Sequence, residues 1–249
     1  HPSPDEFLHG ALIVDPDQWA WSAGTAVAAR EALKRCGRSI DRSVAGLWRG
    51  LHPAEDVLLV VSDHGHLPVH DEVLINKALA DEGLVETVEK RGRLSVSESS
   101  PMIAVTGGGM AHLYLNLQGR DPGGVVAKAD AGQLLKRAAR VLADLGVEGE
   151  PVVEKIAARD ELAALGLDHL NSGDLVVFLK PGFAASSWLD GKVIRPTRYY
   201  GQHGYLNHHD ALCGIFLARG APAGRGKLKE MRAVDVAPKI EAWLGIASR

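Results

Sequence analysis

One stretch of the chain changes abruptly from apolar to polar. Residues 57–61 are five consecutive branched apolar residues, and Ser62, Asp63, His64 and Gly65 follow them directly. Such a run is typical of a strand that is buried on both faces inside a parallel sheet. Ligands bind beyond the carboxyl ends of strands in open α/β sheets. The carboxylate and the imidazole therefore indicate either a ligand site or a polar turn.

Helical patterns lie on both sides of this stretch. The Ala-rich residues 22–36 predict a helix that stops at Gly37, and residues 40–51 continue helically. Residues 71–82 predict a further helix that ends at Gly83. A helix followed by a buried strand is the order found in a βαβ unit.

The middle of the chain is rich in predicted strands. Alternating or uniformly apolar patterns place them at residues 84–88, 94–96, 102–105, 112–117, 152–156 and 175–179. Residues 131–145 predict a strongly amphipathic helix. Further on, residues 212–218 predict a buried strand, and Asp235 is placed as the N-cap of a final helix.

These patterns predict an α/β fold, with a mostly parallel sheet flanked by helices and a small strand-rich cap. We expect parts of the α/β core at residues 1–83 and 181–249, and a cap-like insertion with connecting strands at residues 84–180. A length of 249 residues fits one large domain or a core with a smaller inserted subdomain.

The composition argues against several classes of protein. A net charge of −3 without a block of Lys or Arg gives no indication of a nucleic-acid surface. No stretch approaches the roughly 20 apolar residues that a membrane span needs. Cys36 and Cys213 are too few for a disulfide framework and do not have metal-ligand spacing. Localisation and oligomeric state are not indicated.

Three short motifs carry residues of the kind that bind metal ions. Asp5 and His9 are four residues apart, so both would project from one face of a helix. Asp63 and His64 end the predicted central strand, and His203 lies in a Gly-punctuated loop. Each motif alone is a weak signal. Together, carboxylate and imidazole ligands in this order favour a divalent ion such as zinc.

The same motifs resemble the alkaline phosphatase superfamily, in its type I phosphodiesterase/nucleotide pyrophosphatase branch. The resemblance covers nearly the whole chain and rests on residues 4–10, 62–65, 201–205 and 235–246. It implies an alkaline phosphatase-like core, two divalent metal ions with zinc expected, and a small phosphate-ester substrate such as a nucleotide.

The resemblance also implies a role for each ligand. Asp5, His9 and His203 would bind one ion, and Asp63 and His64 would bind the other. Paired divalent ions about 4 Å apart clamp a transferring phosphoryl group. We therefore expect the first three side chains to meet at one ion with bonds of about 2.0–2.2 Å. The other two should lie within about 5 Å of it.

Part of the family's machinery is expected outside this chain. In the family, the first metal-ligand Asp and the Thr or Ser nucleophile precede the Asp-xxx-His motif, whereas this chain begins without Met almost at that motif. We expect the protein to extend on the N-terminal side and assign no catalytic residue to this chain. The strand at residues 57–61 should then expose an apolar edge or pair with further chain.

Other residues near the motifs have structural and functional interpretations. Thr106 is followed by three glycines, a loop that can cradle phosphate but is more typical of a turn. His112 lies on a predicted strand, either as a packed or surface residue or facing a cleft. Trp19 and Trp21 follow His9 closely, either as packing residues or at the border of a substrate pocket.

The leading hypothesis is a metal-dependent phosphodiesterase or nucleotide pyrophosphatase. The long segment between His64 and His203 argues against a cofactor-independent phosphoglycerate mutase, where the last His follows the Asp-His pair closely. Phosphonoacetate hydrolase and phosphomonoesterase are alternatives within the superfamily. A metal-binding remnant without catalysis is the alternative from a different class.

Overall fold

The structure, a computed structural model, describes residues 4–228 and 230–246. By its internal contacts the chain divides into two units. The first unit comprises His1–Arg30 and Leu67–Leu206, and the second comprises Glu31–His66 and Asn207–Arg249. None of the described helices combines the length and the apolar character that crossing a membrane requires.

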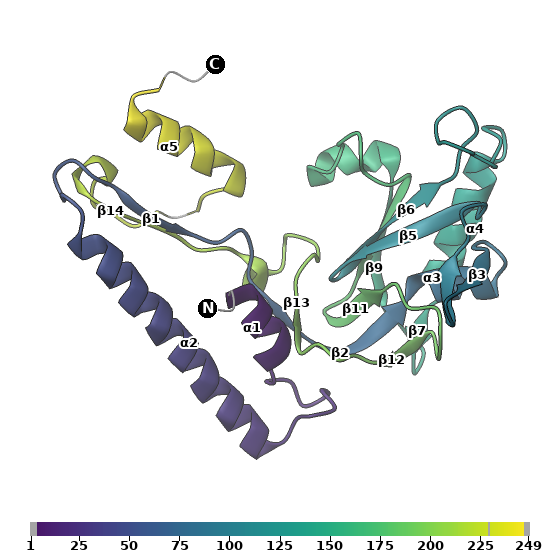
Figure 1. The fold of residues 1–249 in the computed structure, drawn as a ribbon, viewed down its shortest axis with the longest axis horizontal. Coiled ribbons are helices and arrows are strands. Elements are labelled where there is room, and N and C mark those ends of the chain that lie inside the picture. The colour runs from purple at the N-terminus through teal and green to yellow at the C-terminus, as the bar shows by residue number, and fades with distance from the viewer. Residues whose placement is uncertain (1–3, 229, 247–249) are drawn as a thin grey trace. The chain divides into compact units, whose positions relative to one another are not determined.

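A four-stranded antiparallel sheet forms the centre of the first unit (Figure 1). In spatial order its strands are β5 (Met102–Gly107), β6 (Met110–Leu115), β10 (Leu175–Leu179) and β9 (Val153–Ala158). In β6, Ala111, Leu113 and Leu115 are buried while the residues between them are partly exposed, as a strand with one buried face requires. The strands predicted at residues 102–105, 112–117, 152–156 and 175–179 are thus confirmed, with ends that differ from the prediction by up to two residues.

Helices cover one face of this sheet. Leu79 of α3 (Ile75–Asp81) and Leu142 of α4 (Ala131–Ala143) belong to the same buried cluster as Leu113 of β6. On the other face, Leu162 of the 3-10 helix η1 (Arg159–Leu165) packs in a smaller cluster with side chains of β10. Because β10 contributes to both clusters, all of its side chains are buried.

A second sheet of the first unit includes the strand that directly precedes His203. β2 (Leu67–Leu74) pairs in parallel with β11 (Gly182–Ser186), and antiparallel with β12 (Ile194–Pro196) and β13 (Gly201–Gln202). Two short hairpins complete the unit, β3 (Thr87–Lys90) with β4 (Arg93–Val96), and β7 (Gly146–Val147) with β8 (Glu150–Pro151).

Two helix predictions were wrong in their boundaries. Residues 71–74 belong to strand β2 instead of a helix, because strands on both sides of β2 bond to them. Gly37 does not end a helix, since α2 (Ala23–Arg49) runs through it without a break. A glycine inside a helix costs about 1 kcal/mol relative to alanine. The good helix formers around Gly37 outweigh that cost.

The second unit has a two-stranded sheet, in which β1 (Leu58–Val61) pairs antiparallel with β14 (Phe216–Arg219). Helix α5 (Val236–Leu244) follows near the C-terminus (Figure 1). Asp235 stands at its N-cap position, but its carboxylate accepts hydrogen bonds from Arg232 and makes none to the helix.

The predicted parallel environment of β1 is not confirmed. Within the described residues its ladder is antiparallel, and β2 with β11 is the parallel pair among the named strands. Val61 is 48% exposed and Leu217 is 62% exposed. Of the described apolar side chains that are buried, all lie in the first unit. The prediction of a strand that is buried on both faces therefore does not hold for these residues.

A pair of leucines tests where the core of the first unit lies. Leu113 is fully buried in the helix-covered cluster, whereas Leu170 is 86% exposed. We expect Leu113→Ala to lower the free energy of unfolding by about 2–5 kcal/mol, because it removes buried surface and leaves a cavity. Leu170→Ala, the matched control, should change it by less than about 0.5 kcal/mol. Urea titration of both variants measures this, and equal effects would contradict the assignment of the core.

Candidate metal centre

Helix α1 (Pro4–Ala11) presents the first two candidate ligands together. The Nε2 atom of His9 lies 3.7 Å from the Oδ1 atom of Asp5, one helical turn earlier. Asp5 and Glu6 lie in the first turn, where negative charge is favourable to the helix dipole. The predicted helical turn and the shared face of Asp5 and His9 are both present.

His203 lies close to Asp5 and His9, although it comes from the C-terminal end of the first unit's sequence. It follows β13, and its Nε2 atom lies 3.9 Å from the Oδ1 atom of Asp5. The rings of His9 and His203 are 5.4 Å apart between centroids. One potential ligand atom from each of the three side chains lies within 4.8 Å of the others. All three side chains are partly buried, with 20–45% of their surface exposed.

The backbone of β13 fixes the orientation of the His9 ring. Nδ1 of His9 lies 2.7 Å from the carbonyl oxygen of Gly201, and the N–H of Tyr200 donates to the carbonyl oxygen of His9 at 2.8 Å. Because a carbonyl can only accept, Nδ1 must carry the proton. In the neutral imidazole this leaves the lone pair on Nε2, on the side of Asp5.

A glycine allows this close approach. A Cβ atom at Gly201 would lie 2.7 Å from the carbonyl oxygen of Leu8, closer than real Cβ atoms come. Any larger residue at this position would push β13 away from helix α1. The separation of His9 from His203 thus depends on Gly201.

Two of the three glycines after Thr106 lie against the backbone of His203. The N–H of Gly109 donates to the carbonyl oxygen of His203 at 2.7 Å. Gly108 has φ +67°, and a Cβ atom there would collide with the same oxygen. Tyr205 packs its ring over Gly109, and its hydroxyl donates to the carbonyl oxygen of Phe183 at 2.8 Å. Burial raises the pKa of this phenol. These contacts favour the turn interpretation over a phosphate cradle.

Asp63 and His64 lie in the second unit, directly after β1 as predicted. The N–H of His64 donates to Oδ1 of Asp63 at 3.1 Å, and Nε2 of His64 lies 3.6 Å from Oδ2 of Asp63. The turn is held by the N–H of Gly65, which donates to the carbonyl oxygen of Leu212 at 2.9 Å. The Asp63 side chain is 88% exposed. That this pair shares a centre with the three ligands of the first unit stays a prediction.

The residues that converge in the first unit fit a divalent metal ion. One carboxylate and two imidazoles are a donor set that zinc accepts, and His9 has the second bond on its other nitrogen that metal-binding histidines typically make. Asp5, His9 and His203 would hold the ion.

The sequence did not single out Gln18, whose side chain bonds to the backbone near this centre. It is 2% exposed and bonds to backbone groups from three segments of the first unit. A single glutamine between Asp17 and Trp19 has no pattern by which it could have been found. Trp19 itself is 64% exposed, and its indole donates to the carbonyl oxygen of Thr197 at 3.0 Å.

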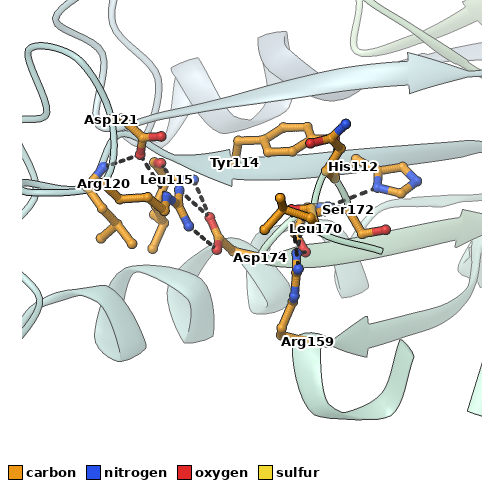
Figure 2. A network of polar contacts seen from close by, with 12 residues as sticks. His112, Tyr114, Leu115, Arg120, Asp121, Arg159, Leu170, Ser172 and Asp174 are labelled. Carbon is orange, nitrogen blue, oxygen red and sulfur yellow. Dashed lines mark hydrogen bonds and ion pairs between the residues drawn. The ribbon is translucent and has the colours of Figure 1, made fainter. Parts of the chain in front are cut away.

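A second polar cluster lies where β6 ends and β10 begins, and its role is structural. Figure 2 shows Arg120 between Asp121 and Asp174, and Arg159 directed at backbone oxygens around Ser172. Nε of Arg120 lies 2.9 Å from Oδ2 of Asp121, and its Nη1 lies 2.6 Å from Oδ1 of Asp174. His112 accepts a hydrogen bond from the N–H of Gly173 at 3.0 Å through Nδ1 (Figure 2). These groups bond to one another or to the backbone and brace the loop before β10.

Comparison with known proteins adds evidence of kinship. The model of the type I phosphodiesterase/nucleotide pyrophosphatase family matches residues 1–206. Human ectonucleotide pyrophosphatase/phosphodiesterase 5 superposes with a TM-score of 0.57 at 16% identity, over 99% of this chain and 53% of that chain. An inactive variant of the murine protein, in complex with AMP, gives 0.56 at 16% identity with the same coverage. This chain therefore spans about half the length of these relatives, whose likeness shows the fold.

Phosphonoacetate hydrolase from Sinorhizobium meliloti 1021 superposes with a TM-score of 0.38 at 15% identity, over 92% of this chain and 48% of that chain, which is too low to compare folds. Among curated proteins, none matches the chain.

His112 should make stability depend on pH. Burial lowers the pKa of its imidazole below the ordinary 6.5. The unfolded chain therefore takes up a proton more readily than the folded one, and the folded state loses stability as pH falls below about 6.5. We expect the stability advantage of the wild type over His112→Asn to shrink between pH 7 and pH 5 in urea titrations. A difference that stays constant across these pH values would contradict this assignment.

Proposed function

Because the chain belongs to the type I phosphodiesterase/nucleotide pyrophosphatase family of the alkaline phosphatase superfamily, we propose that the protein is a metal-dependent phosphodiesterase acting on nucleotide-type substrates. The observation that carries the metal dependence is the convergence of Asp5, His9 and His203. The AMP complex of the murine relative supports a nucleotide as substrate.

In this proposal the residues have distinct roles. Asp5 supplies a negative charge, and His9 and His203 supply neutral nitrogen donors to one divalent ion, for which we propose zinc. Asp63 and His64 would bind a second ion. Bound ions of this kind neutralise phosphate charge and stabilise the attacking and leaving oxygens. We propose no nucleophile among the residues described here.

The backbone contacts favour a ligand set that is ordered before metal binding. The carbonyl of Gly201 holds the proton on Nδ1 of His9, and Gly109 holds the backbone of His203. A second bond of this kind fixes the tautomer of a metal-binding histidine and raises the basicity of its free nitrogen.

Charge is the argument for a diester as substrate. A diester carries one negative charge, and a monoester carries close to two at neutral pH, which requires a further cationic group near the phosphate. Arg198, five residues before His203, is the nearest Lys or Arg to any ligand motif along the sequence. In the structure Arg195 is paired with Glu72 at 2.6 Å and is therefore engaged elsewhere.

The full protein should cleave bis-p-nitrophenyl phosphate at least about tenfold faster in kcat/KM than p-nitrophenyl phosphate, a difference of about 1.4 kcal/mol in barrier. Chelation of metal ions should abolish this activity, and so should His203→Ala, because it removes a ligand. His169→Ala, which alters an exposed loop histidine of the same unit, is the matched control and should retain activity. Release of p-nitrophenolate measures the rate for both substrates, with and without chelation, and for both variants.

The outcomes separate the alternatives. Equal rates, or a preference for the monoester, would contradict the diesterase assignment and favour a phosphomonoesterase. Cleavage of phosphonoacetate but neither ester would favour phosphonoacetate hydrolase. Metal binding without cleavage of any of these compounds would support a non-catalytic protein. Activity that survives chelation would contradict the metal dependence itself.

A further inference from the structure

We propose that Gln18 is a positioning residue for the metal centre. Its side chain acts through hydrogen bonds to the backbone, and not through contact with the side chain of a metal ligand. The inference deepens the proposed function and rests on the part of it that makes Asp5, His9 and His203 metal ligands. Gln18 lies in the turn-rich segment between α1 and α2, with 2% of its surface exposed.

The carboxamide of Gln18 is saturated with bonds to the backbone. Its oxygen accepts from the N–H groups of Val14 at 2.9 Å and Asp15 at 3.0 Å. Its nitrogen lies within bonding distance of three carbonyl oxygens, those of Leu12 at 2.9 Å, Val69 at 3.0 Å and Tyr200 at 2.7 Å. An amide nitrogen has two hydrogens, so one of them is shared between two acceptors.

These partners belong to the segments that carry the ligands. Leu12 follows α1, which carries His9, and Val69 lies in β2, on which β13 is paired. Tyr200 precedes Gly201, the residue that holds the His9 ring. Tyr200 is itself bonded at both backbone groups, since its N–H donates to His9 and its carbonyl accepts from the N–H of Val69 at 3.1 Å. Gln18 thus connects the chain after His9 to the chain before His203.

The chemistry of the site requires an amide. A carboxylate has no hydrogen to donate, so a glutamate at this position would face three carbonyl oxygens with a negative charge. A protonated glutamate could donate one hydrogen bond. Each backbone group left without a partner in such a buried place destabilises this arrangement. The expected relief is a displacement of residues 200–201 from α1, which would separate His9 from His203.

The first test compares the zinc affinity of two variants, each of which replaces a carboxamide with a carboxyl group of nearly the same shape. We expect Gln18→Glu to weaken zinc binding by about 10–100-fold in calorimetric titration, the loss typical when support behind a metal ligand is removed. Asn76→Asp is the matched control. Asn76 is also 2% exposed, and its amide exchanges two hydrogen bonds of 2.8 Å with the backbone of Ala104. It should lose stability without losing zinc affinity.

A spectroscopic readout locates the effect at the ligands. With Co²⁺ in place of zinc, the visible absorption reports the coordination geometry. Gln18→Glu should change this spectrum, whereas Asn76→Asp should reproduce that of the wild type. His203→Ala should abolish binding at this place, which assigns the measured affinity to the proposed ligands. Zinc affinity in Gln18→Glu equal to that of the wild type would overturn the inference, as would a wild type that binds no zinc.

A measurement on the wild type covers the case in which Gln18→Glu does not fold. If the Gln18 contacts are coupled to the centre, zinc should slow the hydrogen exchange of the Val14 and Asp15 amides, which bond to the Gln18 oxygen. Exchange of the Ala104 amide should not respond. Unchanged exchange at Val14 and Asp15 would overturn the inference. Zinc binding with these responses, but without diester cleavage, would instead contradict the proposed function alone.

Discussion

The candidate centre depends on the hydrogen bonds that tie His9 to the start of β13. The carbonyl oxygen of His9 accepts a hydrogen bond from the N–H of Tyr200, and the His9 ring donates one to the carbonyl oxygen of Gly201. These two bonds bring helix α1 against a strand that lies almost two hundred residues later in the chain, and they also fix which ring nitrogen carries the proton. Gly201 permits the approach, and Gln18 and Gly109 hold the two sides of the contact.

The sequence indicated the candidate ligands, whose role stays a prediction, but not the side chains that hold them in place. The spacing of Asp5 and His9 implied a shared helix face, and the structure has that face. Nothing in the spacing could bring His203 to them, because that contact comes from long-range strand pairing; the family resemblance alone indicated it. Gln18 was not predicted, since the partners of its side chain are backbone groups from distant segments, which leave no pattern in the sequence.

Fold prediction succeeded where one face of an element is buried and failed where neighbours override local preference. β6 shows the predicted alternation because the helix-covered core lies on one side of it. Residues 71–74 became a strand because strands on both sides of β2 bond to them. β1 was predicted from apolarity alone, which does not specify the direction of its partner. The boundaries of the inserted cap, at residues 84 and 180, stay a prediction.

The position of a bound metal ion tests the central claim most directly. Crystals of the protein grown with zinc, measured on both sides of the zinc absorption edge, locate the ion by its anomalous scattering. The account predicts an ion about 2.0–2.2 Å from a carboxylate oxygen of Asp5, from Nε2 of His9 and from a ring nitrogen of His203. Nδ1 of His9 should remain bonded to Gly201. Zinc bound away from these three side chains, or to Nδ1 of His9, would contradict the account.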